Sequence, residues 1–161
     1  MVATLLLAAA LSRPAPLTGH QLTTAVGYGP QGPILVVSWT GRRRWGAWFR
    51  VDQQDVPRVM ANSTHVSTTA GSVGVGWRPR PRLTVGLGYG RKEETNTLYG
   101  EDVGNGEVIP VVLDVRKDRQ DGLAAIGTWT FPVNDTLGVA ASASAGPGGF
   151  GAAVGVTFFF P

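Results

Sequence analysis

Large apolar residues alternate with small residues along most of this chain, at the period of a β-strand. Side chains of a strand point in turn to its two faces. In the stretch 150–160 one face is large and apolar, and the other holds only Gly, Ala, Thr and one Phe. A soluble sheet normally sets its apolar face against a charged, solvated one. A strand with no charged face indicates lipid on the outside and a narrow lumen on the inside.

The same alternation recurs in seven more segments. They span about 20–29, 34–41, 45–53, 66–77, 82–92, 111–131 and 136–146. The connections near residues 43, 79 and 134 are short, whereas those near residues 61 and 105 are long, the longest running from about Glu93 to Pro110. An even number of strands with short turns on one side is typical of outer-membrane proteins, whose short turns face the periplasm. We therefore predict an all-β fold, an eight-stranded antiparallel up-and-down transmembrane β-barrel.

The composition and the placement of charges exclude several classes of site and partner. The 161 residues include 23 glycines and no cysteine, which excludes disulfides, thiolate metal sites and a cysteine nucleophile. Basic residues cluster in short turns instead of forming a stripe on one face, so no nucleic-acid partner is expected. The segments GLGYG and SVGVG lack the strand–turn–helix context of a phosphate-binding loop, and no cofactor is predicted. Between Gly122 and Pro161 only Asp135 is charged, which a soluble sheet would not tolerate.

The N-terminus reads as a targeting segment. The apolar run from Ala3 to Leu11 is too short to span a bilayer as a helix and has the length of a signal-peptide core. Small residues at positions 10 and 12 offer a cleavage site. Residues 1–15 are therefore predicted to be a signal peptide, and residues 16–161 a single barrel domain.

From about residue 20 to residue 160 the chain resembles the small eight-stranded outer-membrane barrels, the OmpA-type transmembrane domain and OmpX-like proteins. Such proteins end in an aromatic residue preceded by alternating apolar positions, which the barrel-assembly machinery reads. That signal is matched by Val154, Val156, Phe158 and Phe160, although Pro161 follows it. The resemblance implies an integral protein of the outer membrane of a Gram-negative-type bacterium, in contact with outer-membrane lipids and lipopolysaccharide.

Aromatic residues lie beside the short turns, on the outward side of their strands. These residues, Trp39, Trp45, Trp77, Trp129 and Phe131, are predicted to form a periplasmic aromatic girdle. The alternative is that they are core aromatics of a β-sandwich.

Charged residues of both signs fall on the predicted lumen side or on its extension above the barrel. They are Arg50, Asp52, Lys92, Glu94, Asp114, Arg116 and Asp118. One interpretation is a charged constriction or ligand site. The other, which we favour because buried charges must be paired, is an ion-pair network that fills a narrow barrel.

Outward positions of the longest hairpin are also charged. Arg91, Glu93, Lys117 and Arg119 predict a strand pair that projects beyond the bilayer. That pair could bind a partner strand or lipopolysaccharide phosphates, and the alternative, which we favour, is a ribbon that is merely solvated. Oxygen ligands for Ca²⁺ occur in its loop, but their spacing matches no EF-hand, and no metal site is predicted. They are Glu101, Asp102, Asn105 and Glu107.

His65 and Ser67 form an H-x-S pair on one strand face, which resembles the catalytic pair of outer-membrane lipid A deacylases, although the rest of that motif is absent. Three functions follow, in order of preference. The first is a non-enzymatic barrel whose exposed loops serve envelope interaction or adhesion, with a protein partner at those loops. The second is a narrow porin-like pore or small-ligand carrier through a glycine-lined lumen. The third and most remote is a lipid A-modifying enzyme.

Overall fold

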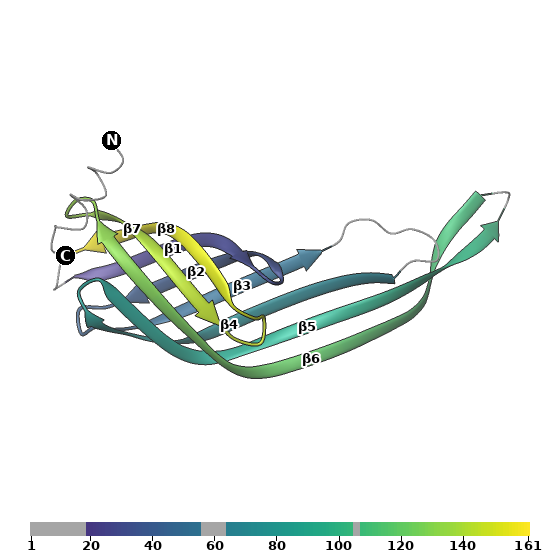
Figure 1. Ribbon diagram of the computed structural model, residues 1–161, viewed down its shortest axis with the longest axis horizontal. Coiled ribbons are helices and arrows are strands. Elements are labelled where there is room, and N and C mark those ends of the chain that lie inside the picture. The colour runs from purple at the N-terminus through teal and green to yellow at the C-terminus, as the bar shows by residue number, and fades with distance from the viewer. Residues whose placement is uncertain (1–18, 56–63, 105–106) are drawn as a thin grey trace.

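Eight antiparallel strands form one closed barrel in the computed structural model, which describes residues 19–55, 64–104 and 107–161 (Figure 1). The strands are β1 (His20–Gly29), β2 (Gly32–Thr40), β3 (Trp45–Asp55), β4 (Thr64–Arg80), β5 (Leu83–Gly104), β6 (Glu107–Pro132), β7 (Leu137–Ala145) and β8 (Gly151–Phe160). Each strand is hydrogen-bonded to the next, and β8 returns to β1. The predicted fold class is confirmed.

The alternation of the sequence decides which face of each strand points inward. Along β8 every second residue is buried, and its outward neighbours Val154 and Phe158 are exposed. The same parity holds along β2, where Ile34 and Val36 are buried and Trp39 is exposed. The barrel interior is therefore the core of the protein. Its apolar cluster consists of Ala25, Ile34, Val36, Trp48, Ala124, Ile126 and Ala153.

The two ends of the barrel differ. At one end, which we call the turn end, lie Gly19, Phe160 and the tight connections 41–44, 81–82 and 133–136. In the last of these, the Asn134 side-chain carbonyl accepts hydrogen bonds from the N–H groups of Thr136 and Leu137, 2.9 and 2.7 Å away. The opposite end, the hairpin end, carries the connections 30–31 and 146–150 and the C-terminal ends of β3 and β5.

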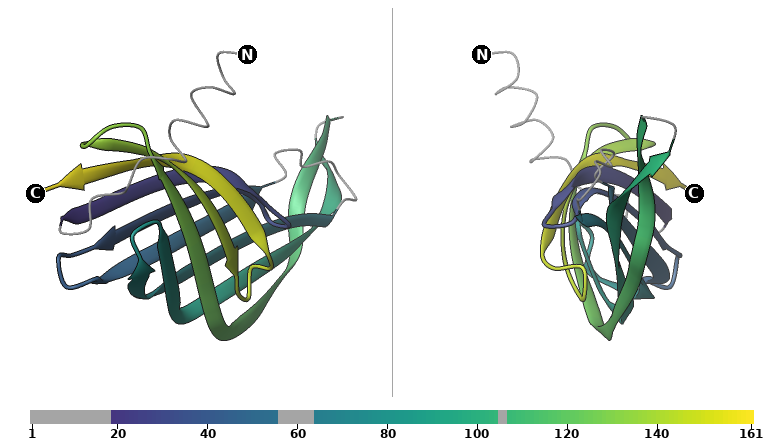
Figure 2. Two further views of the ribbon diagram at one scale, coloured as in Figure 1. Left: turned by 60° about the vertical axis from the view of Figure 1, so that its left-hand side comes forward. Right: turned by 90° about the vertical axis from the view of Figure 1, so that its right-hand side faces the viewer.

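Strand lengths explain why the molecule is elongated. β1, β2, β3, β7 and β8 have 9 to 11 residues, whereas β5 and β6 have 22 and 26. The predicted connection from Glu93 to Pro110 was therefore wrong as a loop, because most of it continues the paired strands, with one register shift between Leu98 and Tyr99. Figures 1 and 2 show this hairpin standing beyond the rest of the barrel.

Some sequence predictions fall outside the described residues. These include the predicted signal peptide, 1–15, Asn105 and the side chains of Asp102 and Glu107. Among the residues that are described, no group of His, Asp or Glu could hold a metal ion. No described helix is long and apolar enough to cross a membrane.

Candidate functional site

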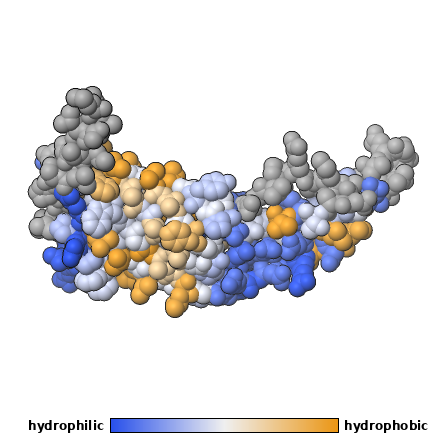
Figure 3. Space-filling model, in the orientation of Figure 1, coloured by the Kyte–Doolittle hydropathy of each residue, from blue (hydrophilic) through white to orange (hydrophobic). Residues whose placement is uncertain are grey.

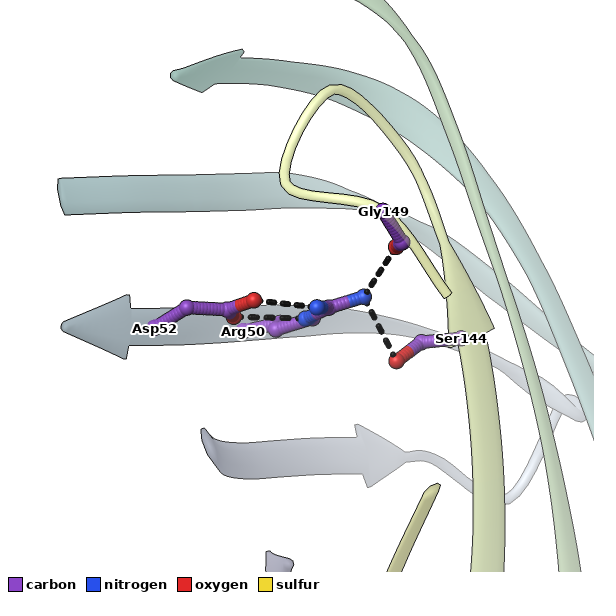
Figure 4. A network of polar contacts seen from close by, with 4 residues as sticks. All are labelled: Arg50, Asp52, Ser144 and Gly149. Atoms are coloured by element: carbon purple, nitrogen blue, oxygen red, sulfur yellow. Dashed lines mark hydrogen bonds and ion pairs between the residues drawn. The ribbon is translucent and has the colours of Figure 1, made fainter. Parts of the chain in front are cut away.

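A buried ion pair lies in the lumen near the hairpin end. Arg50 and Asp52 are 3% and 1% exposed. The Arg50 guanidinium donates to both carboxylate oxygens of Asp52, with 2.6 Å between Nε and Oδ1. Its Nη1 donates to Ser144 Oγ and to the Gly149 carbonyl, each 3.0 Å away (Figure 4). Arg50 thus satisfies its charge and ties β3 to β7 and to the β7–β8 connection.

The β7–β8 connection, residues 146–150, folds in over this ion pair. A Cβ at position 148 would lie 2.7 Å from the Ala70 Cβ and 3.1 Å from Asp52 Oδ2. A Cβ at Gly90 would lie 2.9 Å from Pro147 Cδ. Gly149 has a φ of +87°, which a residue with a side chain adopts only at a cost. The connection therefore caps the lumen from above, with contacts to β3, β4 and β5.

Trp48 fills the middle of the lumen. Its side chain is 2% exposed and lies against inward glycines of the facing strands. A Cβ at Gly74 would lie 2.7 Å from Trp48 Nε1, and one at Gly86 would lie 2.6 Å from Trp48 Cδ1. These glycines make room for an indole and do not line an open channel. Hydroxyl pairs complete the packing, with 2.8 Å between Thr23 and Thr157 and 2.9 Å between Thr128 and Ser142.

The seven charged residues that the sequence grouped together occupy three environments. Arg50 and Asp52 are buried in the lumen. Lys92 and Glu94 are partly buried at the mouth, with 3.0 Å between Nζ and Oε2. Asp114, Arg116 and Asp118 are exposed on the projecting hairpin, and the contact of Arg116 Nε with Asp118 Oδ2 is 3.6 Å long. The last three residues are therefore not part of the buried network.

A second charged cluster lies where the hairpin leaves the barrel. Asp121 Oδ1 accepts a hydrogen bond from Arg91 Nε at 2.9 Å, and Asp121 Oδ2 accepts one from Arg119 Nε at 3.0 Å. The hydrogen bond from Arg119, followed by that from Arg91, holds the pKa of the Asp121 carboxyl below its usual value. Lys92, then Asn96, lowers the pKa of Glu94 in the same way. Figure 3 shows this hydrophilic band next to the apolar barrel wall.

Beyond that band β6 is exposed on both faces, from Pro110 to Gln120. β7 pairs with β6 only from Ala125 onward, so among the residues that the structure describes no strand pairs with that edge of the outer part of β6. This part also carries exposed apolar side chains. They are Val111, Val112, Leu113 and Val115, of which Leu113 is 64% exposed. The hairpin is thus a two-faced ribbon with an apolar outer section.

The outward aromatic residues gather at the turn end. Trp45 and Trp77 are paired in register on β3 and β4, and their rings stack with 6.2 Å between centroids. Trp39 stacks on His20 at 5.6 Å. Trp129 is exposed on β6, and Phe131 is half-buried on the same strand. The wall above them is apolar, and Leu87 and Leu123 are 75% and 88% exposed.

His65 and Ser67 lie near the hairpin end of β4, on its outer face, and both are half-buried. In register His65 pairs with Thr97, and Ser67 pairs with Thr95 of β5 and Asp55 of β3. The period-two pattern places Trp48 on the inward face, but sequence reasoning missed its packing against Gly74 and Gly86, and it missed the capping connection. Their only signal was a set of small residues facing inward, which did not say what filled the space.

Comparison with known proteins supports the fold. No protein-family model matches the sequence, and no curated protein matches it either. Among solved structures, the barrel is similar to Ail, the attachment invasion locus protein of Yersinia pestis, crystallised with the heparin analogue sucrose octasulfate. The TM-score is 0.50 at 12% identity, over 88% of this chain and 98% of that one.

Two further matches are more distant. The N-terminal β-barrel domain of Pseudomonas aeruginosa OprF has a TM-score of 0.43 at 10% identity, over 89% of this chain and 98% of that one. Neisserial surface protein A has a TM-score of 0.43 at 10% identity, over 88% and 95%. The chain thus has the fold of the small eight-stranded outer-membrane barrels, and the resemblance predicted from the sequence is confirmed for the fold.

Proposed function

We propose that this chain is a non-enzymatic barrel of the bacterial outer membrane that presents its β5–β6 hairpin outside the cell for envelope interaction or adhesion. The observation that carries the proposal is the length of β5 and β6, which is at least twice that of β1, β2, β3, β7 and β8. A barrel that served only as a membrane plug would not need a ribbon exposed on both faces. The apolar outer section of that ribbon, including Val112 and Leu113, offers a binding surface.

The wall has the dimensions and the chemistry of a membrane span. The ten residues of β8 rise roughly 3.3 Å each, and at a tilt near 40° they cover about 25 Å, the height of the apolar band in such barrels. In this orientation the turn end faces the periplasm, and its tryptophans act as the interfacial girdle. The cluster of Arg91 and Arg119 would then meet the phosphates of lipopolysaccharide.

The outward residues of β8 fit an assembly role. Val154, Val156, Phe158 and Phe160 all lie on the outer face of β8, where the barrel-assembly machinery could read them before closure. Both edges of β8 are paired in the finished barrel, so this recognition belongs to the unfolded chain.

The pore alternative finds less support. Trp48 occupies the lumen, and residues 146–150 cover its upper end. We expect no stable single-channel openings when the protein is incorporated into planar bilayers. The enzyme alternative rests on His65 and Ser67 alone, and no observation favours it over the binding function.

The function is tested by shortening the hairpin. Replacing Tyr99–Leu113 by Asn-Gly joins Leu98 to Asp114, which face each other in register, and keeps every β4–β5 pair. Cells displaying equal amounts of the two proteins are compared for retention on immobilised matrix glycans and proteins. At least about fivefold fewer cells of the shortened form should be retained, a change of roughly 1 kcal/mol in effective binding.

A matched variant asks whether apolar contacts carry the binding. Replacing Val112, Leu113 and Val115 by Thr keeps the length and β-propensity of the ribbon while removing its apolar surface. It should lose retention as the shortened form does. Equal retention of wild type and shortened form, or no retention of wild type on any surface, would end the adhesion proposal.

A further inference from the structure

A buried arginine at the turn end of the lumen has no carboxylate partner among the described residues. Arg78 is 2% exposed. Its Nη2 donates to the Gly19 carbonyl at 3.2 Å, and its Nη1 has no hydrogen-bond partner in the part of the chain that the structure describes. A buried charge without a compensating group is costly, because it has lost its hydration. An anionic group is therefore needed to compensate the positive charge of Arg78.

Two more buried polar atoms lie at the same end. Gln21 and Thr40 are paired in register on β1 and β2, and both side chains point into the lumen. Gln21 Nε2 and Thr40 Oγ1 also lack a hydrogen-bond partner within the described residues. Gly19, which Arg78 reaches across the lumen, is two residues before Gln21 and on the same side of the chain. The three unpaired groups therefore lie at the same end of the lumen, and all three can donate hydrogen bonds.

The surroundings add positive charge. The Arg78 N–H donates to the Arg44 carbonyl at 2.8 Å, so the end of β4 lies against the β2–β3 turn. That turn contributes three exposed arginines, Arg42, Arg43 and Arg44, to the turn end of the barrel.

Negative charge is scarce at this end. Asp135, in the β6–β7 turn, is the one acidic residue in the three turns there, and it has an interaction of its own. Residues 1–18 contain no Asp or Glu. Asp52 is already held by Arg50 near the other end of the lumen.

We propose that the turn-end mouth of the lumen binds a phosphate-type anion, with Arg78 as its buried donor and Gln21 and Thr40 beside it. A tetrahedral oxyanion suits this set, because it accepts hydrogen bonds on several oxygens and neutralises the guanidinium. The exposed arginines of the β2–β3 turn draw anions toward the mouth. Such an anion can be free phosphate or the phosphate of a lipid headgroup. The site is independent of the hairpin, so it stands whether or not the hairpin serves adhesion.

The test measures binding of inorganic phosphate to the folded barrel in zwitterionic detergent, by calorimetry at constant ionic strength. Wild type should bind saturably. Arg78→Met should weaken the affinity at least about tenfold, because it removes a charged hydrogen-bond donor. Arg80→Met is the matched control, since Arg80 lies two residues away on the same strand but is exposed, and it should change the affinity less than about twofold.

Other variants keep the test decisive if Arg78→Met does not fold, as judged by heat-modifiable migration. Gln21→Leu combined with Thr40→Val leaves every arginine in place and should still weaken phosphate binding at least about fivefold. No saturable binding to wild type would overturn the proposal. So would equal effects of Arg78→Met and Arg80→Met, or an unchanged affinity in the Gln21→Leu/Thr40→Val variant.

The two sources of phosphate are separated in nanodiscs. If a headgroup occupies the site, nanodiscs of phosphatidylglycerol should suppress the titration with inorganic phosphate relative to micelles of a detergent without phosphate groups. If free phosphate is the ligand, the titration should be equal in the nanodiscs and in the micelles. Either result agrees with the site and identifies what fills it.

Discussion

β5 and β6 pass through two environments, and the pattern of their side chains differs between the two. Within the barrel, Leu87 faces outward at 75% exposure while Gly86 faces inward against Trp48. Beyond Arg91 and Asp121 both faces carry charges, and β6 is exposed on either side. An apolar wall of this exposure is stable only in lipid, whereas a ribbon with charges on both faces is stable only in water. We therefore expect the change of pattern along one strand to mark the edge of the membrane.

The largest effect should come from opening the barrel itself. Removing Phe158–Pro161 takes away the partners of His20, Gln21 and Leu22 on β1, so backbone groups would lie unpaired in the bilayer. Each such group costs several kcal/mol, and we expect no insertion at all. The measurement is heat-modifiable migration after refolding into lipid vesicles.

Two control variants should still insert. Deleting Pro161 alone should leave insertion unchanged, since Pro161 lies beyond the end of β8. The Tyr99–Leu113 replacement removes far more residues but none within the barrel wall, and it should also insert. Normal insertion without Phe158–Pro161 would break the distinction between a wall that must close and a hairpin that need not.

The next largest effect on the free energy of unfolding should separate the buried ion pair of the lumen from an exposed ion pair of the hairpin. Asp52→Asn leaves Arg50 buried beside a neutral group and should lower the free energy of unfolding by about 3–5 kcal/mol. Asp118→Asn removes the exposed partner of Arg116, two residues away on β6, and should cost about 0–1 kcal/mol. Urea titrations in vesicles, followed by tryptophan fluorescence, compare the two. Similar losses for both variants would mean that the lumen is hydrated as the ribbon is.

The same substitution at two positions compares a side chain that faces lipid with one that faces water. Leu87→Arg puts a charge near the middle of the apolar wall and should reduce the unfolding free energy by roughly 2–4 kcal/mol. Leu113→Arg, at a side chain of comparable exposure on the hairpin, should change it by less than about 0.5 kcal/mol. Equilibrium unfolding in vesicles gives both values. A loss at Leu113 as large as that at Leu87 would place the hairpin in the membrane.

The smallest effect concerns the charged band between the two environments. The pKa of Asp121 is lowered in the folded protein, so its ion pairs stabilise the fold fully above the unfolded pKa of about 3.9 and lose that effect as pH falls through the folded pKa. Carboxyl NMR titration should give Asp121 a midpoint below the reference value, and Arg119→Gln should move it upward. A midpoint at or above the reference value would contradict the ion pairs of Asp121 with Arg119 and Arg91.

Much of this architecture was readable from the order of residues, because lipid and lumen impose a period of two that survives in single strands. The inward placement of Trp48, Arg50 and Asp52 followed from that period alone. What fills the lumen did not follow from that period, because alternation describes each strand by itself. The contact of Trp48 with Gly74 and Gly86 joins three different strands. The inward fold of residues 146–150 depends likewise on contacts with three other strands.

The predicted loop from Glu93 to Pro110 failed for a related reason. Charged and polar residues there indicated a connection, because strands had been recognised by their apolar face. Outside the membrane a paired ribbon needs no apolar face, and its backbone hydrogen bonds continue from Glu93 as far as Gly104. The same absence of a bilayer explains why Asp114, Arg116 and Asp118 do not belong to the lumen.

The central claim is that the wall lies in the outer membrane, the hairpin outside the cell and the tight turns in the periplasm. Because the chain has no cysteine, a single cysteine can be placed at Leu113, Leu87 or Asp135 and treated in intact cells with a membrane-impermeant maleimide. We predict rapid labelling of Leu113→Cys, no labelling of Leu87→Cys, and labelling of Asp135→Cys only after the outer membrane is permeabilised. Labelling of Asp135→Cys in intact cells while Leu113→Cys stays protected would invert the topology and contradict the account.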